Sequence, residues 1–279
     1  MDYITLNDGN KMPNIGLGVF KLADPKECEE LVKYAISIGY RMIDTAQVYG
    51  NEEAVGNAIK NCGVPREQLF ITTKLCFKDS DNALESIKES LRKLQLDYLD
   101  LIMIHWPYGN YYHAYRVMEE LKEQGLVKSI GVCNFDPDRI VDLCYFNKVV
   151  PAVNQIEMHV YCQRKSELKW HEEYGITTEA YAPLGQGKVN QVFTEPILVD
   201  IAKKYNKTTA QVMLKFLSQQ GIIIIPKSAH KERIKENFEI FDFTLTDEEM
   251  NAIATLDKVT PIGGKAEVPE RAHYLIVEK

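Results

Sequence analysis

A regular alternation of short apolar runs with amphipathic stretches is the feature that most constrains the fold of this chain. Each apolar run has the length and composition of a buried parallel strand, and a helical pattern separates most neighbouring runs. The runs recur roughly every 25 to 30 residues, the spacing of one strand and one helix in a barrel. The eight runs centre on Leu17, Ile43, Ile71, Ile102, Ile130, Val153, Thr178 and Ile223. The pattern therefore predicts an α/β protein with a TIM-type (β/α)8 barrel.

Several further elements are expected outside this repeat. The segment 7–10, with the sequence Asn-Asp-Gly-Asn, lies between two short extended pieces and predicts an N-terminal β-hairpin. The long interval between the last two strands predicts two helices, over 195–205 and 209–219. A final helix is expected to begin after Thr246, which starts a capping-box pattern. No linker rich in proline, glycine or serine interrupts this order, so residues 1–279 are expected to form one domain.

The main alternative fold for such an alternation is a doubly wound sheet that binds a dinucleotide. That fold is expected to carry Gly-x-Gly-x-x-Gly directly after its first strand. Here Gly16-Leu17-Gly18 is followed by Lys21 in place of the third glycine, and Gly185-Gln186-Gly187 also lacks a third glycine. The glycine pattern therefore favours the barrel.

Charge and composition exclude several classes of function. A formal net charge of −7 argues against a nucleic-acid partner, because phosphate backbones bind to positively charged surfaces. No segment is long and apolar enough to span a membrane, and the N-terminus lacks the pattern of an export signal. The six cysteines are scattered without a Cys-x-x-Cys pair, which is typical of reduced thiols, and no set of metal ligands is found. We therefore expect a cytoplasmic protein without a metal site.

Four polar residues follow apolar runs in the first half of the chain, where a barrel enzyme places its catalytic groups. They are Asp44, Tyr49, Lys74 and His105. Each alone has an ordinary structural explanation, such as a capping acid, a packed aromatic ring or a surface lysine. Together they mark three successive strand ends on the face where barrel active sites lie. A carboxylate, a phenol, an amine and an imidazole in that arrangement predict a catalytic site.

Short motifs along most of the chain resemble those of the aldo-keto reductases and occur in the order of that family. They are Gly16-Leu17-Gly18, Ile43-Asp44-Thr45-Ala46, Tyr49-Gly50-Asn51-Glu52, Lys74, Ile104-His105-Trp106-Pro107, Gly131-Val132-Cys133-Asn134-Phe135, Asn154-Gln155-Ile156-Glu157, Tyr181-Ala182-Pro183-Leu184-Gly185 and Ile225-Pro226-Lys227-Ser228. One such motif alone is weak, whereas the whole set in this order is specific. The resemblance implies a TIM-type barrel, NADPH as hydride donor, reduction of a small-molecule carbonyl substrate, and a monomer.

The resemblance also implies roles for the four polar residues. Tyr49 would donate the proton, and His105 would hydrogen-bond to the carbonyl oxygen of the substrate. Carbonyl reduction needs a proton at oxygen, and a free phenol with a pKa of about 10 is a reluctant donor at neutral pH. A charged Lys74 beside the phenol would favour the phenolate, while Asp44 would keep the lysine charged and in place. These residue types therefore suit the implied reaction.

The same resemblance assigns residues to the cofactor and the substrate. The cofactor-binding residues would be Cys133, Asn134, Gln155, Tyr181, Leu184, Lys227, Ser228, Arg233, Glu236 and Asn237. Of these, the first three would meet the carboxamide and Tyr181 would stack on the nicotinamide. The group after the last strand, where barrels often bind phosphate, would hold the adenosine 2′-phosphate and the adenine. The substrate, expected to be small and largely uncharged, would contact Phe20 and Trp106 near the nicotinamide. Tyr108, just after His105-Trp106-Pro107, is placed to line the mouth of the barrel, with a simple packing role as the alternative.

This chain departs from the family pattern at several positions. Cys133 stands where the family commonly has serine, and Val19-Phe20 replaces a common threonine-tryptophan pair in the substrate wall. The tail 259–279 matches no family motif, although the corresponding segment of the family folds over the substrate opening. These departures leave the reaction type unchanged and the substrate open.

Two other functions are compatible with these residues. A lysine at a strand end of a barrel can also attack a carbonyl, so a Schiff-base aldolase that uses Lys74 is the alternative enzyme. A nucleotide-sensing or structural protein with weak catalysis is the alternative outside catalysis. Borohydride trapping of Lys74 distinguishes the first from a reductase, and an intact set of four polar residues argues against the second.

Overall fold

A closed barrel of parallel strands forms the centre of the structure. The computed structural model describes residues 1–187, 190–259, 261–262 and 269–277. Within these residues, eight parallel strands pair in chain order from β3 to β10. They are β3 (Leu17–Gly18), β4 (Met42–Asp44), β5 (Phe70–Leu75), β6 (Leu99–Ile104), β7 (Val127–Cys133), β8 (Val153–Glu157), β9 (Thr177–Tyr181) and β10 (Ile223–Ile224). The predicted TIM-type barrel is confirmed, and each predicted strand position lies in one of these strands.

Backbone hydrogen bonds close the sheet between its first and last strands. Ile15, just before β3, forms a parallel bridge with Ile224 in β10. The N–H of Gly16 donates to the carbonyl of Ile224 at 2.9 Å, and the N–H of Ile224 donates to the carbonyl of Asn14 at 3.1 Å. At this seam the barrel therefore has no open sheet edge.

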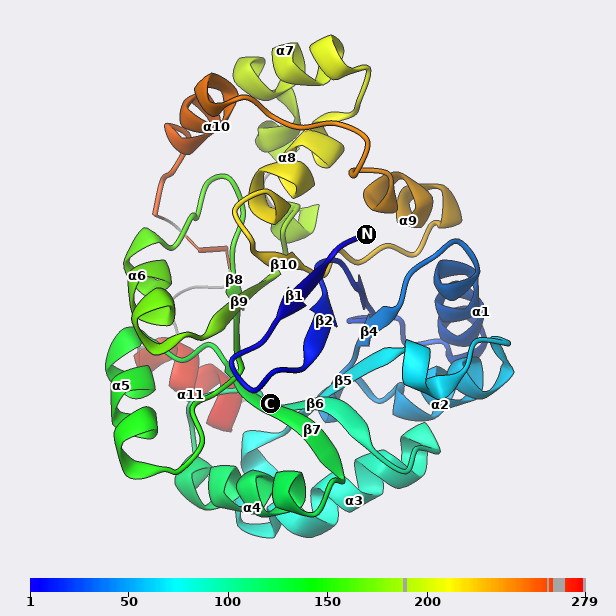
Figure 1. The fold of residues 1–279 in the computed structure, drawn as a ribbon, viewed down its shortest axis with the longest axis vertical. Coiled ribbons are helices and arrows are strands. Elements are labelled where there is room, and N and C mark those ends of the chain that lie inside the picture. The colour runs from blue at the N-terminus through cyan, green and yellow to red at the C-terminus, as the bar shows by residue number, and fades with distance from the viewer. Residues whose placement is uncertain (188–189, 260, 263–268, 278–279) are drawn as a thin grey trace.

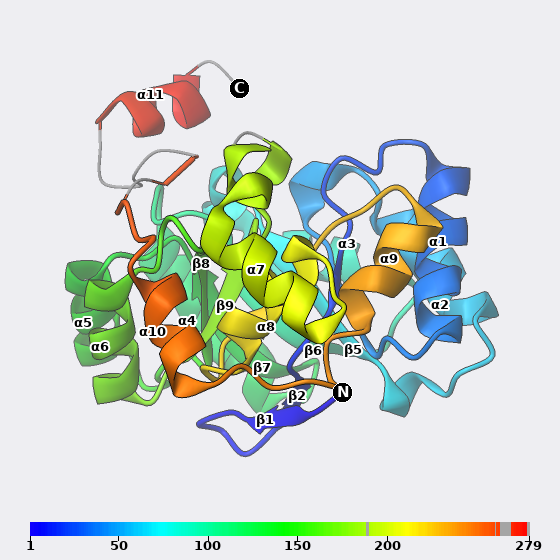
Figure 2. The same cartoon turned by 90° about the horizontal axis from the view of Figure 1, so that it is seen from above.

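Helices surround the strands on the outside of the barrel (Figure 1). They are α1 (Pro25–Ser37), α2 (Glu52–Asn61), α3 (Ala83–Leu94), α4 (Tyr111–Glu123), α5 (Pro137–Phe146), α6 (Lys165–Tyr174), α7 (Pro196–Tyr205), α8 (Thr209–Ser218), α9 (Lys231–Phe238) and α10 (Asp247–Ala254). A further helix, α11 (Pro269–Val277), lies apart from them at one end of the barrel (Figure 2). Local sequence explains several of the starts. The side chain of Asp24 accepts from the N–H of Glu27 at the start of α1, and a capping box begins α10 at Thr246. None of the helices in the described part of the chain has the length and apolar character needed to cross a membrane.

The elements expected outside the repeat are largely present. Helices α7 and α8 both lie between the last two strands, and α10 follows the barrel, as predicted. Helix α11 was not predicted, although it begins with a proline and an acid, Pro269 and Glu270, which are common in the first turn of a helix. Within the tail 259–279, positions 260, 263–268 and 278–279 lie outside the described residues.

The N-terminal hairpin closes one end of the barrel. Strands β1 (Tyr3–Thr5) and β2 (Lys11–Pro13) pair in antiparallel register, as the segment 7–10 predicts. Leu6 and Met12 of the hairpin pack in the same apolar cluster as residues at the amino ends of the barrel strands, such as Met42. Figure 2 shows the hairpin and α11 at opposite ends of the barrel. The carboxyl ends of the strands therefore lie at the end opposite the hairpin, where barrel enzymes carry their active sites.

Two apolar cores lie on the two faces of the sheet. The outer core joins strand residues such as Ile71 and Ile102 to helix residues such as Val55 and Ile87. The smaller inner core lies inside the barrel and extends from the hairpin to Cys133 at the end of β7. Its buried members are Leu6, Met12, Met42, Phe70, Leu101, Met103, Cys133, Ala152, Val153, Ile223 and Ile225. The inner residues nearer the carboxyl end are mainly polar, and they form the candidate site.

Candidate active site

Strand geometry brings the predicted residues into one layer near the carboxyl end of the barrel. Side chains alternate between the two faces of a strand, so residues two apart share a face. Met42 of the inner core is followed in this way by Asp44, and Met103 by His105. The predicted residues that share the inner face by this alternation are Asp44, Lys74, His105, Cys133, Gln155 and Tyr181. Tyr49 joins them from a short 3-10 helix, η1 (Gln47–Tyr49), that follows β4.

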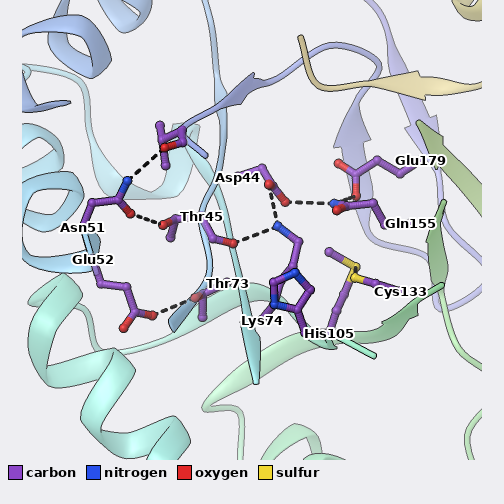
Figure 3. A network of polar contacts seen from close by, with 12 residues as sticks. Asp44, Thr45, Asn51, Glu52, Thr73, Lys74, His105, Cys133, Gln155 and Glu179 are labelled. Carbon is purple, nitrogen blue, oxygen red and sulfur yellow. Dashed lines mark hydrogen bonds and ion pairs between the residues drawn. The ribbon is translucent and has the colours of Figure 1, made fainter. Parts of the chain in front are cut away.

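A buried ion pair joins the predicted acid and amine. Nζ of Lys74 lies 2.6 Å from Oδ1 of Asp44 and donates to the carbonyl of Thr45 at 2.9 Å (Figure 3). The lysine is fully buried. Burial alone would lower the pKa of Lys74, but Asp44, together with Tyr49 and Cys133, outweighs this effect and the pKa is raised. The amine is therefore held charged.

The ring of Tyr49 lies beside this ion pair and beside two predicted ligand-binding side chains. Its centre is 5.1 Å from Nζ of Lys74, 5.8 Å from the centre of the His105 ring and 5.0 Å from that of Phe20. Burial raises the pKa of Tyr49 to about 12, although Lys74 acts in the opposite direction. Lys74 favours the phenolate, as expected, but its effect on the pKa is smaller than that of burial. Tyr49 therefore keeps its proton at neutral pH.

Hydrogen bonds from neighbouring elements fix the loop that carries Tyr49. Oε1 of Gln47 accepts from the N–H of Cys76 at 2.8 Å, while Nε2 donates to Oγ of Ser86 at 2.9 Å. Oδ1 of Asn51 accepts from Oγ1 of Thr45 at 2.7 Å. Gln47 and Asn51, on either side of Tyr49, therefore link its loop to the ends of β4 and β5 and to α3.

The residues predicted to meet the nicotinamide lie at the ends of β7, β8 and β9. Asn134 has a φ of 60°, a left-handed conformation that asparagine tolerates well. Its Oδ1 accepts from the hydroxyl of Tyr181 at 2.9 Å, and its Nδ2 donates to the carbonyl of His105 at 3.2 Å. Cys133 is buried, with Sγ 3.7 Å from Sδ of Met103. Asn134 thus connects three of the strand-end segments.

Gln155 connects Asp44 to a second acid that the sequence motifs did not point to. Its Nε2 donates to Oδ2 of Asp44 at 2.9 Å and to Oε2 of Glu179 at 2.8 Å (Figure 3). Glu179 is fully buried on β9. Burial, reinforced by the charge of Asp44, raises the pKa of Glu179 to about 8. An acidic residue within an otherwise buried strand was the available signal in the sequence.

The residues predicted to hold the 2′-phosphate follow β10. In this region Lys235 pairs with Glu239 at 3.7 Å, whereas neither Lys227 nor Arg233 takes part in an ion pair within the described residues. Burial, with the charge of nearby Lys21, lowers the pKa of Lys227 despite the opposing charge of Glu27. Cations without an ion-pair partner among the described residues suit an anionic ligand.

Local hydrogen bonds or burial place the remaining predicted cofactor residues. Oγ of Ser228 accepts from the N–H of His230 at 3.0 Å and is nearly buried. Glu236 accepts from Oγ1 of Thr208 at 2.6 Å, and Asn237 is buried on the inner side of α9. Leu184 is partly buried and packs against the outer core.

The residues predicted to contact substrate form an aromatic wall at the open end. Trp106 stacks on His105 with ring centres 6.3 Å apart and on Tyr108 at 6.1 Å. The side chain of Phe20 is 40% exposed, so it is accessible to a ligand. The guanidinium of Arg271 in α11 lies over Trp106, and its Nε has no hydrogen-bond partner among the described residues. No sequence motif pointed to Arg271, because only the folded tail brings it here.

Comparisons with known proteins show the family of this chain. The sequence profile of the Aldo/keto reductase family matches residues 14–258. Methylglyoxal reductase DkgA from Yersinia pestis is 46% identical over 268 residues, covering 95% of this chain and 96% of that protein. The corresponding protein from Escherichia coli K12 is 44% identical over 263 residues, covering 93% and 95%.

Solved structures show the same likeness. An aldo-keto reductase enzyme from a Medee basin deep-sea metagenome superposes with a TM-score of 0.92 at 41% identity, covering 95% of this chain and 98% of that one. A Bombyx mori aldo-keto reductase in complex with NADP gives a TM-score of 0.87 at 36% identity, covering 94% and 95%. From its motifs, its barrel and these relatives, the chain belongs to the aldo/keto reductase family.

Proposed function

We propose that this chain reduces aldehydes or ketones to alcohols with NADPH, and that Tyr49 is the proton donor. The observation that carries the proposal is the position of a protonated Tyr49 beside the buried Lys74–Asp44 ion pair. Two relatives named as methylglyoxal reductases, and one solved as a complex with NADP, support the reaction and the cofactor.

The residues present fit a nicotinamide dinucleotide phosphate. Lys227 and Arg233 lack ion-pair partners within the described residues and offer positive charge to a phosphate. Gln155 and Asn134 offer amide groups at the carboxyl end of the barrel, where a carboxamide can be recognised. When bound, NADPH would supply a hydride to the carbonyl carbon of the substrate.

The side chains of the site then handle the proton and the developing charge. Tyr49 holds its proton at neutral pH, so the proton is available at the hydroxyl. The charge of Lys74 lowers the free energy of the phenolate that is left when the proton departs. We assign to His105 a hydrogen bond to the carbonyl oxygen, which orients the substrate and stabilises negative charge on that oxygen. The aromatic wall of Phe20, Trp106 and Tyr108 would enclose a small substrate.

The aldolase alternative conflicts with the state of Lys74. A Schiff-base lysine must be neutral to attack a carbonyl, whereas Asp44 holds this amine charged at 2.6 Å. Borohydride added with a carbonyl substrate is therefore expected to leave Lys74 unmodified in the mass spectrum. Covalent trapping at Lys74 would instead support the aldolase.

A spectrophotometric assay of NADPH absorbance tests the proposed reaction. Substrates should include aldehydes, ketones, dicarbonyls and keto-sugars, with NADH as a parallel cofactor. We expect turnover of at least one of these classes, at rates within the common range of about 1 to 1,000 per second. Tight NADPH binding without turnover of any class would favour the nucleotide-sensing alternative.

We further propose a monomeric enzyme of the cytoplasm. The six cysteines are all free in the structure, as expected in a reducing compartment. Light scattering of the purified chain tests the monomer, and a dimeric mass would contradict it.

A further inference from the structure

Glu179 lies at the centre of the barrel, although no step of the proposed reaction uses it. It is the middle residue of β9, it is fully buried, and it is the direct parallel partner of Gln155 on β8. Its Oε1 has no hydrogen-bond partner among the described residues. A buried carboxyl with so few partners lowers stability, which points to a role in the site.

The amide of Gln155 links this acid to the catalytic carboxylate. Its Nε2 donates to Asp44 at 2.9 Å and to Glu179 at 2.8 Å, so both N–H bonds of the amide are used (Figure 3). Within the described part of the chain, no group donates to Oε1 of Gln155. The carbonyl oxygen is therefore the atom of this amide that can accept a hydrogen bond from a ligand.

A single bond to Asp44 would not fix the amide of Gln155. The terminal torsion of a glutamine side chain is broad, so an amide held through one N–H can rotate about that bond. Rotation would present the second N–H to a ligand in place of the carbonyl oxygen. The bond to Glu179 removes that freedom, because the amide is then held at two points.

We propose that Glu179 is a positioning residue for the cofactor: it holds Gln155 with the carbonyl oxygen towards the carboxamide NH2 of the nicotinamide. The inference rests on the proposed use of NADPH and deepens it. It means that the site recognises a primary amide donor on the pyridine ring, and that an acid outside the family motifs sets this preference.

The groups around Glu179 define its charge. Asp44 on β4, Lys74 on β5 and the Cys133 thiol on β7 act on the buried acids, whereas its partner on β10 is the apolar Ile223. With its pKa raised to about 8 by burial, Glu179 is mainly protonated at neutral pH. The unpartnered Oε1 can carry that proton while Oε2 accepts from Gln155.

The test compares NADPH with its 3-acetylpyridine analogue, in which a methyl group replaces the carboxamide NH2. Dissociation constants are measured by fluorescence titration for the wild type and two variants. Glu179→Leu removes the acceptor at similar volume, and Glu179→Gln keeps an acceptor oxygen. We expect the wild type to prefer NADPH, the leucine variant to lose about 3- to 10-fold of this preference, and the glutamine variant to retain it.

Three outcomes would overturn the proposal. Equal weakening of both cofactors in Glu179→Leu would show that the acid only packs the barrel. Unchanged affinity of that variant for both cofactors would show that Gln155 needs no second bond. A wild type without preference would show that the amide NH2 is not recognised. Failure of the proposed function gives another result. A wild type that prefers NADPH as expected but reduces no carbonyl substrate would contradict the reductase assignment and leave the role of Glu179 intact.

If Glu179→Leu does not fold, the pH dependence of the glutamine variant decides. Ionisation of Glu179 strengthens its bond to Gln155, because charged acceptors bind about twice as strongly as neutral ones. The preference of the wild type for NADPH over the analogue should therefore rise between about pH 7 and pH 9. The preference of Glu179→Gln should stay constant over the same range, and parallel profiles would overturn the proposal.

Discussion

The guanidinium carbon of Arg271 lies 4.7 Å from the ring centre of Trp106, so the C-terminal helix reaches the open end of the barrel. Trp106 in turn stacks on His105, one of the four proposed catalytic residues. A cation over an indole ring stabilises such a contact by about 0.5 to 2 kcal/mol. Helix α11 therefore belongs to the proposed substrate wall. Segments at the end of a barrel, outside its strands, can vary function while the scaffold stays fixed.

Removal of the chain after Val259 is expected to change the relative kcat/KM among carbonyl substrates. NADPH affinity should stay within about threefold, because the residues proposed to bind the cofactor lie before the cut. Arg271→Gln should shift the same substrate ranking in the full chain, with Glu270→Gln on the same exposed helix as the control. A folded truncation with an unchanged ranking would show that the tail only packs against the barrel.

Replacement of Tyr49 by phenylalanine is expected to abolish most carbonyl reduction while leaving NADPH affinity unchanged. The hydroxyl is the proposed proton source, and loss of a general acid typically costs about 10²- to 10⁴-fold in rate. Single-turnover oxidation of NADPH measures the chemical step, and titration measures binding. Near-normal turnover would refute Tyr49 as the donor.

Arg233→Ala is expected to lower the affinity for NADPH by about 10- to 100-fold and the affinity for NADH much less. Only NADPH carries the 2′-phosphate, and a lost charge-assisted pair costs about 1.5 to 3 kcal/mol. Lys235→Ala is a suitable control, because this lysine lies on the same helix but already pairs with Glu239 at 3.7 Å. Equal weakening of both cofactors by Arg233→Ala would place the phosphate elsewhere.

A buried histidine outside the site is expected to make stability depend on pH. His171 contacts Nδ2 of Asn154 through Nε2 at 2.8 Å and Oγ1 of Thr178 through Nδ1 at 2.7 Å. Burial lowers its pKa from 6.5 to about 4. Between pH 6.5 and about pH 4, His171 is protonated in the unfolded chain but neutral in the folded chain. The free energy of unfolding therefore falls as the pH falls through this window.

Relative to His171→Gln, the wild type should lose about 2 kcal/mol of unfolding free energy between pH 7 and pH 5. Urea unfolding at each pH measures the difference. Glu179, with its pKa raised to about 8, acts in the opposite direction, but it is present in both proteins and cancels. Equal slopes for the two proteins would mean that His171 is protonated in the fold.

Strand order and the membership of the inner layer followed from local patterns. Apolar runs with helical patterns between them predict parallel neighbours, because a crossover helix returns the chain to the same end of the sheet. The period of two along each strand then puts Asp44 on the same face as Met42, and His105 on the same face as Met103. The glycine in the segment 7–10 predicted a hairpin turn, because glycine readily adopts the positive φ that such turns need. In the structure Gly9 has a φ of 86°.

Only the tertiary structure decided the properties of the site that depend on burial and on contacts between residues far apart in the sequence. The pKa of Tyr49 rises because burial outweighs a lysine that the motif places beside it, and a sequence does not display burial. The two bonds of Gln155 exist because β8 packs beside β9 while Asp44 approaches across the barrel. Arg271 reaches Trp106 only through the path of the tail. Periodicity determines which face a side chain takes, whereas desolvation and long-range contacts arise only when the barrel closes.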